Sequence, residues 1–125
     1  MKTVLLVEDS ITERESLTAL LQQARLLVVS ASSVEEAEGK LKEQKPDLIV
    51  LDVILPGKSG FEFCRELKGN PDTKTIPIVI CSTKDTDVDK MWGNMLGADF
   101  YLPKPVNSEA LTTTIEKIRA NHYNG

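Results

Sequence analysis

The chain alternates short apolar runs with longer segments in which apolar residues recur at helical spacing. Runs rich in valine, isoleucine and leucine lie at 4–7, 26–30, 48–53, 76–81 and 98–102. The second, third and fourth runs are apolar on both faces, which is typical of parallel strands covered by helices on each side. The pattern therefore predicts five parallel strands.

Each strand is followed by a segment with the apolar spacing of a helix. Three of these segments begin with the S/T-x-x-E pattern of a capping box, at Ser10, Ser33 and Ser59. Gly97 marks the end of the fourth helix, and Lys45-Pro46 that of the second. The apolar positions include Ile11, Leu17 and Leu21; Val34, Ala37 and Leu41; Phe61, Cys64 and Leu67; Val88, Met91, Trp92 and Met95; and Leu111, Ile115 and Ile118.

This alternation predicts an α/β fold, a (βα)5 doubly wound five-stranded parallel sheet. We expect the flavodoxin-like strand order 2-1-3-4-5. The 125 residues fit one compact domain. We expect it to cover residues 1–121 and to be followed by a C-terminal tail, residues 122–125.

Composition narrows the possible functions. A net charge of -4 argues against a protein that binds nucleic acid through a basic surface. The first apolar run meets acidic residues too soon for a signal peptide or a membrane span, so we expect a cytoplasmic protein. Cys64 and Cys81 have no CxxC spacing and no nearby histidine, and are interpreted as packing residues.

Polar residues with possible chemistry follow four of the five strands. They are Glu8 and Asp9 after the first, Asp52 at the end of the third, Ser82 after the fourth and Lys104 after the fifth. In a doubly wound sheet, ligands bind beyond the carboxyl ends of the strands. Three carboxylates at one edge repel each other, which favours either a raised carboxyl pKa or a bound divalent cation. Oxygen ligands without histidine or cysteine favour Mg²⁺.

Each of these residues also has a purely structural interpretation. Asp9 is a favourable N-cap, Glu8 a solvated acid, Ser82 a strand-end hydroxyl and Lys104 a surface cation. Asp52 is harder to explain this way, because an ionised carboxylate within an apolar strand needs partners. The placement of all five at one edge favours a functional site.

Four segments together resemble response regulator receiver domains of two-component signalling, in the single-domain form typified by the chemotaxis regulator CheY. They are the acidic pair in VLLVEDS, the turn in LIVLDVILPGKSG, the hydroxyl in IVICS and the segment GADFYLPKP. The similarity runs from Thr3 to about Ile118.

The resemblance implies a role for each site residue. Asp52 would be the phosphoacceptor, and Glu8, Asp9, Asp52 and the backbone carbonyl of Ile54 would hold Mg²⁺. Ser82 and Lys104 would both contact the phosphoryl group. A metal, an ammonium and a hydroxyl can together compensate the charge that develops during phosphoryl transfer.

The resemblance also implies how a signal would be passed on. Phosphorylation would draw Ser82 inward, and Tyr101 would turn from an exposed to a buried position. The partner face would comprise the fourth helix, the fifth strand and the fifth helix, with Trp92 and Tyr101. From the residues alone, Trp92 is equally compatible with a core position, and Tyr101 with a half-buried strand aromatic. The Lys104-Pro105 bond is expected to be cis.

These implications predict a stand-alone response regulator rather than an enzyme with an external substrate. Its expected partners are a sensor histidine kinase and a downstream target protein. We expect it to bind neither nucleic acid nor a membrane. We expect a monomer or a weak dimer that depends on phosphorylation. The fragment MWGNMLGADFYLPKP resembles regulators of type IV pilus and twitching or phototaxis systems more than flagellar ones, and this resemblance implies motility or taxis signalling.

Three other functions compete with this interpretation. The alternative in the same family is a degenerate receiver that binds partners without phosphorylation. A haloacid-dehalogenase-type phosphohydrolase would need an acid two residues after Asp52, where Ile54 stands. A nucleotide-binding P-loop is excluded because no strand is followed by GxxxxGK[ST].

Overall fold

The computed structural model describes the backbone of residues 1–124 and the side chains of residues 1–121. The tail expected over 122–125 lies outside the residues described in full, and its boundary stays a prediction. The strands are β1 (Thr3–Val7), β2 (Leu27–Ala31), β3 (Leu48–Leu51), β4 (Ile78–Ser82) and β5 (Phe100–Pro103). The helices are α1 (Ile11–Gln23), α2 (Val34–Glu43), α3 (Gly60–Gly69), α4 (Asp87–Met95) and α5 (Ser108–Asn124).

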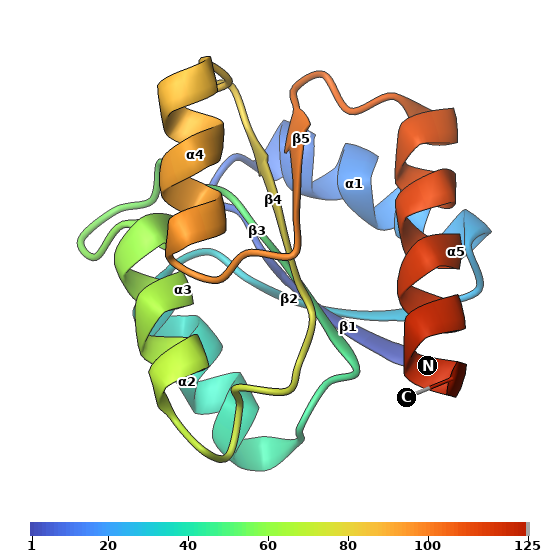
Figure 1. Cartoon of the computed structure of the whole chain (residues 1–125), viewed down its shortest axis with the longest axis horizontal. Coiled ribbons are helices and arrows are strands. Elements are labelled where there is room, and N and C mark those ends of the chain that lie inside the picture. The colour runs from blue at the N-terminus through green and yellow to red at the C-terminus, as the bar shows by residue number, and fades with distance from the viewer. Residues whose placement is uncertain (125) are drawn as a thin grey trace.

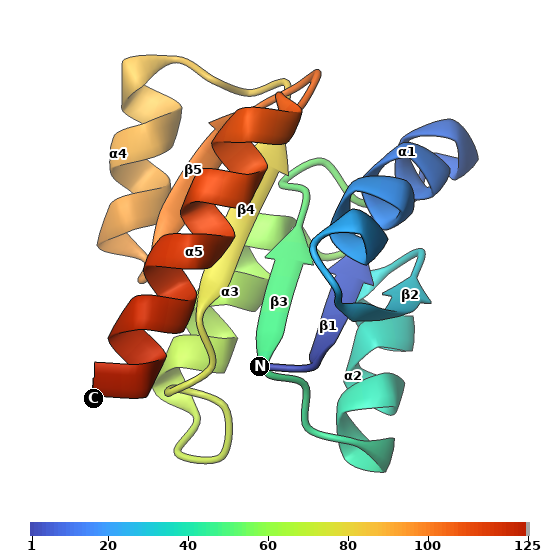
Figure 2. The same cartoon turned by 90° about the vertical axis from the view of Figure 1, so that its right-hand side faces the viewer.

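The five strands form one parallel sheet in the order β2-β1-β3-β4-β5, which confirms the predicted fold and strand order. Helices cover both faces of the sheet (Figures 1 and 2). All five strands run in the same direction, so their carboxyl ends meet at one edge. The Lys104-Pro105 bond is cis, as expected.

Two apolar layers hold the helices against the sheet. On one face, α1 and α5 contribute Leu17, Leu21, Leu111 and Ile115 to a core shared with β1, β3 and β4. On the other face, side chains of α2 and α3 pack on the same strands. Their buried residues are Val34, Ala37, Phe63, Cys64 and Leu67. The central strands β3 and β4 are buried along their whole length, as their apolar residues on both faces predicted.

The burial of strand β2 differs from the prediction made for it. Its run was interpreted as apolar and covered on both faces, but β2 is an edge strand, and Leu27 is 69% exposed. Only Ala31 is buried in this strand. Its valines and leucine follow strand propensity rather than burial, because β-branched residues also suit an exposed edge.

The serines that were predicted to begin three helices do so. Ser10, Ser33 and Ser59 each accept a hydrogen bond from the backbone N–H three residues later. A complete reciprocal capping box is formed at α4, where Thr86 and Asp89 bond each other's backbone N–H groups. That box was not predicted, because aspartate rather than glutamate stands at its third helical position.

Gly60 allows α3 to begin directly beneath the end of β3. A Cβ atom built on Gly60 would lie 1.9 Å from the carbonyl oxygen of Asp52, an impossible contact. The Gly60 N–H also donates to the Val53 carbonyl at 2.9 Å. This close approach fixes the turn that follows Asp52.

We expect Gly60→Ala to lower the free energy of unfolding by about 2–3 kcal/mol, because backbone must move to admit the methyl group. The matched control is Gly39→Ala in α2, where a Cβ would meet nothing within 4 Å. That change is expected to stabilise by about 0.5–1 kcal/mol. Urea unfolding of both variants checks this, and equal stabilities would contradict the packing assigned to Gly60.

Candidate functional site

The carboxyl edge of the sheet brings together polar residues that are distant in sequence. Val7 pairs with Leu51 in the β1–β3 register, so the residues that follow them, Glu8 and Asp52, emerge side by side. Lys104 directly follows β5, and its N–H donates to the carbonyl oxygen of Ser82 at 3.1 Å. Parallel strands thus deliver two carboxylates and one ammonium to a single place.

Lys104 is the centre of this arrangement. Its Nζ donates to Asp52 Oδ2 at 2.8 Å, to Glu13 Oε2 at 2.8 Å and to Glu8 Oε1. An ammonium has three N–H donors, and these three carboxylates occupy all of them. The Lys104 side chain is only 5% exposed. The lysine is therefore held in one position rather than extended into solvent.

Asp52 is a buried carboxylate with partners on both oxygens. The residue is 6% exposed. Its Oδ2 accepts from Lys104, and its Oδ1 accepts from the N–H of Ile54 at 3.2 Å. Because β3 ends at Leu51, Asp52 stands just beyond the strand, where the chain turns toward α3. These contacts explain how the apolar stretch tolerates an acid.

The pKa values follow from burial and pairing. Burial raises the pKa of Glu8, against the opposing effect of its hydrogen bonds to Lys104 and to the Ser10 N–H. Burial alone would lower the pKa of Lys104, but hydrogen bonds to Asp52, Glu13 and Glu8 outweigh it and raise the pKa. Lys104 is therefore a cation at neutral pH.

Glu13 was missed as a site residue by the sequence analysis. Its position in the S-x-x-E pattern at Ser10 was interpreted as half of a capping box. Ser10 does cap α1, but the Glu13 carboxylate bonds Lys104 instead of returning to the cap. The available signal was its place in the first turn of the helix after β1, which faces the carboxyl edge of the sheet.

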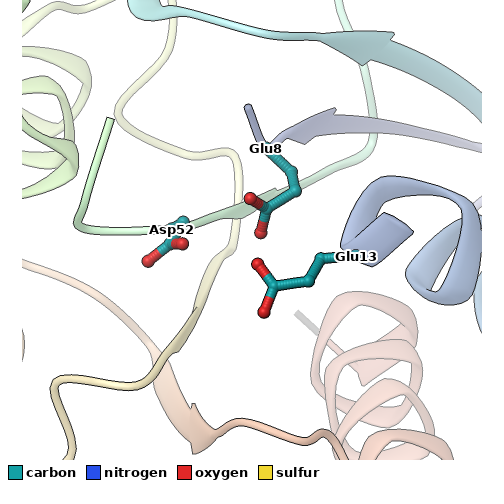
Figure 3. Close-up of side chains that lie close together, drawn as sticks. All are labelled: Glu8, Glu13 and Asp52. Carbon is teal, nitrogen blue, oxygen red and sulfur yellow. The ribbon is translucent and has the colours of Figure 1, made fainter. Parts of the chain in front are cut away.

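Glu8, Glu13 and Asp52 form a compact acidic group (Figure 3). One oxygen from each lies within 4.8 Å of the others. Even with Lys104 among them, negative charge is in excess. Carboxylate oxygens at this spacing suit a hard divalent cation such as Mg²⁺, which is the metal that the strand-end acids predicted. The donor set therefore fits the implied metal.

Asp9 lies apart from this acidic group. Among the side chains that the structure describes, the group of three carboxylates does not include it, and Asp9 is exposed. It is not the N-cap either, since Ser10 takes that position. Arg14 bonds the carbonyl oxygen of the preceding Glu8 at 2.8 Å and so fixes this turn. Metal binding by Asp9 and by the Ile54 carbonyl stays a proposal.

Ser82 and Tyr101 are connected through the backbone of one residue. The buried Ser82 Oγ accepts from the N–H of Lys84 at 3.2 Å, and the Tyr101 hydroxyl donates to the Lys84 carbonyl. The half-buried ring packs on α4, where a Cβ at Gly93 would lie 2.8 Å from it. Burial raises the pKa of Tyr101 to about 12, so the phenol keeps its proton.

The exposed side of α4 carries an apolar stripe. Trp92 is 51% exposed, which excludes the core position that its sequence pattern also allowed. The apolar spacing of this helix therefore does not mark a buried face, because Gly93 is the buried residue of α4. Large apolar side chains exposed together are typical of binding surfaces. The exposed set on α4 is Val88, Met91, Trp92 and Met95.

Comparison with known sequences gives a consistent result. A family model described as the response regulator receiver domain matches residues 4–116. The chain is 38% identical over 120 residues to Protein PilH of Pseudomonas aeruginosa, covering 96% of this chain and 99% of PilH. It is also 35% identical over 117 residues to the phosphate regulon transcriptional regulatory protein PhoB of Escherichia coli, covering 94% of this chain. The chain spans about half the length of PhoB.

Solved structures agree with these sequence relatives. A response regulator from Chloroflexus aurantiacus superposes with a TM-score of 0.90 at 34% identity, covering 95% of this chain and 98% of that one. The chemotaxis response regulator CheY4 of Vibrio cholerae gives 0.85 at 34% identity, covering 94% and 98%. Within the described residues, every helix is too short or too polar to cross a bilayer.

Proposed function

Because this chain belongs to the response regulator receiver domain family, we propose that Asp52 accepts a phosphoryl group from a phosphohistidine of a sensor histidine kinase. The family is one of signalling domains rather than metabolic enzymes. One observation supports the assignment to this residue: Asp52 is a carboxylate at the carboxyl ends of the strands, paired with the buried cation Lys104.

The transfer uses the carboxylate itself as nucleophile. An oxygen of Asp52 forms a bond to phosphorus, the phosphorus–nitrogen bond of the donor breaks, and the imidazole nitrogen leaves with the electron pair. An ionised carboxylate needs no general base. Lys104 places positive charge next to the oxygens that gain charge, and the buried Ser82 hydroxyl is a further donor at this edge.

A divalent metal, when bound, neutralises charge on the phosphoryl oxygens and offsets repulsion by the acidic group. The residues proposed to hold it are Glu8, Asp9, Asp52 and the backbone carbonyl of Ile54. The excess negative charge of the acidic group supports this proposal. Glu8 and Asp52 are already within reach of one another, and Asp9 follows Glu8 at the same strand end.

The signal would pass from the site to the face formed by α4, β5 and α5. Movement of the Ser82 hydroxyl toward a phosphoryl oxygen breaks its contact with the Lys84 N–H, and the Lys84 carbonyl holds Tyr101. Release of this loop would let Tyr101 change position against α4. We propose that a target protein, in motility or taxis signalling, binds this face.

Incubation with acetyl phosphate and Mg²⁺, followed by intact mass measurement, tests the acceptor function. We expect one phosphoryl group on the wild-type protein, and none when EDTA removes the metal. An unchanged mass under both conditions would contradict phosphorylation and leave a receiver that binds partners without it.

Trp92→Ala tests the partner face. We expect it to weaken target binding by about 2 kcal/mol or more, because exposed tryptophans often anchor interfaces. The measurement compares proteins retained by immobilised wild-type and variant protein, each with and without beryllofluoride. Ile11→Ala, which removes an exposed apolar side chain from α1, is the control and should retain the target. Equal retention by wild type and Trp92→Ala would contradict the assignment.

A further inference from the structure

Glu13 is a contact of Lys104 that the family roles proposed above do not use. It comes from α1, whereas Glu8 and Asp52 follow the strands β1 and β3. Its Oε2 lies 2.8 Å from Lys104 Nζ, the same distance as the acceptor Asp52. Glu13 and Asp52, the proposed acceptor, thus bind the Lys104 ammonium at equal distance.

The donors of Lys104 set up a competition. All three N–H groups are occupied by Glu8, Glu13 and Asp52. A phosphoryl group on Asp52 brings additional oxygens that accept from a cation. Lys104 can donate to them only by giving up a partner it already has. The identity of that partner determines how readily the phosphoryl group is accommodated.

Burial decides which partner is given up. The Glu8 side chain is 1% exposed, so its carboxylate cannot turn to water and keeps either Lys104 or a bound divalent metal as its counter-ion. The Glu13 side chain is 42% exposed, and its carboxylate can return to solvent at low cost. Asp52 stays beside Lys104 because the phosphoryl group is bonded to it, so Glu13 is the partner that can be released.

We propose that Glu13 is a positioning residue that holds Lys104 before phosphorylation and competes with the phosphoryl group for it. This inference rests on the proposed acceptor function of Asp52. If so, Glu13 makes the site less favourable for a phosphoryl group on Asp52 and lowers its affinity for a non-covalent phosphoryl mimic.

Two substitutions separate tethering from simple charge repulsion. Glu13→Gln removes the charge and leaves a neutral amide oxygen, which holds an ammonium more weakly than a carboxylate does. Glu13→Asp keeps the charge but withdraws the carboxylate by one methylene, about 1.5 Å, beyond its hydrogen bond to Nζ. If Glu13 acts by holding Lys104, both variants bind a phosphoryl mimic more tightly than the wild type. If it only repels anions, Glu13→Asp behaves like the wild type. Glu15→Gln is the control, because Glu15 is exposed on the same helix and outside the acidic group.

The experiment is a titration with beryllofluoride, a non-covalent phosphoryl mimic, at Mg²⁺ concentrations that saturate each variant, followed by amide NMR. We expect Glu13→Gln and Glu13→Asp each to bind beryllofluoride about 3–10-fold more tightly than the wild type. Glu15→Gln should stay within about twofold. In the free protein, the Lys104 Nζ signal of ¹⁵N-lysine-labelled samples should shift in both Glu13 variants and not in the control.

Three outcomes would contradict parts of this scheme. Unchanged affinity in both Glu13 variants overturns the competition. A gain in Glu13→Gln alone, with Glu13→Asp at the wild-type value, overturns the tether in favour of charge repulsion. If the wild type binds no beryllofluoride and gains no phosphoryl group from acetyl phosphate, the acceptor function itself fails, and the role of Glu13 fails with it.

Discussion

Asp52→Asn is expected to abolish phosphoryl addition, with at least a 100-fold lower extent at equal times, on the order of the loss seen when a nucleophile is removed. An amide oxygen carries no negative charge and cannot form the acyl phosphate. The variant keeps the shape of the side chain, and its one amide oxygen can still accept from Lys104 or from the Ile54 N–H, the donors that bond the two Asp52 oxygens. The loss would therefore report chemistry rather than unfolding.

Intact mass after incubation with acetyl phosphate and Mg²⁺ measures this effect. Asp72→Asn is the control, because Asp72 is an exposed aspartate in the turn between α3 and β4. It should be phosphorylated like the wild type. A phosphoryl group on the Asp52→Asn protein at the wild-type rate would place the acceptor elsewhere.

Lys104→Met is expected to lower the free energy of unfolding by about 3–5 kcal/mol at neutral pH without metal. Methionine retains much of the apolar stem but leaves Glu8 and Asp52 buried without their cation. Their mutual repulsion, together with Glu13, then opposes folding. Mg²⁺ should restore part of the loss, because a cation bound to the acidic group replaces the missing charge.

Urea unfolding with EDTA and with Mg²⁺ measures the two states of this variant. The control is Lys117→Met, which removes an exposed lysine from α5 and should change stability by less than about 0.5 kcal/mol. A loss of less than about 1 kcal/mol for Lys104→Met would show that Lys104 is not needed to compensate the buried acids.

Much of the fold follows from local patterns in the sequence. The both-sided apolar runs of β3 and β4 predicted central strands, and the serines Ser10, Ser33 and Ser59 predicted three helix starts. The exposure of β2 was harder to predict, because its apolar run satisfies strand propensity without being buried. Periodicity likewise could not show that the apolar side of α4 faces solvent.

The site was predictable where topology determines it. Residues directly after parallel strands must meet at one edge, which brought Glu8, Asp52 and Lys104 together. Glu13 was not predictable in this way, because a glutamate at the third position of a helix can bond either its own cap or a neighbouring group. Only the position of the Lys104 ammonium decides between these two partners.

The most direct test of the central claim is the position of the phosphoryl group on the chain. After incubation with acetyl phosphate and Mg²⁺, borohydride reduces an aspartyl phosphate to homoserine, which peptide mass spectrometry locates. We expect homoserine at position 52 and an unmodified chain when acetyl phosphate is omitted. Homoserine at another aspartate, or a phosphorylated protein without any homoserine, would contradict the assignment of Asp52 as the acceptor.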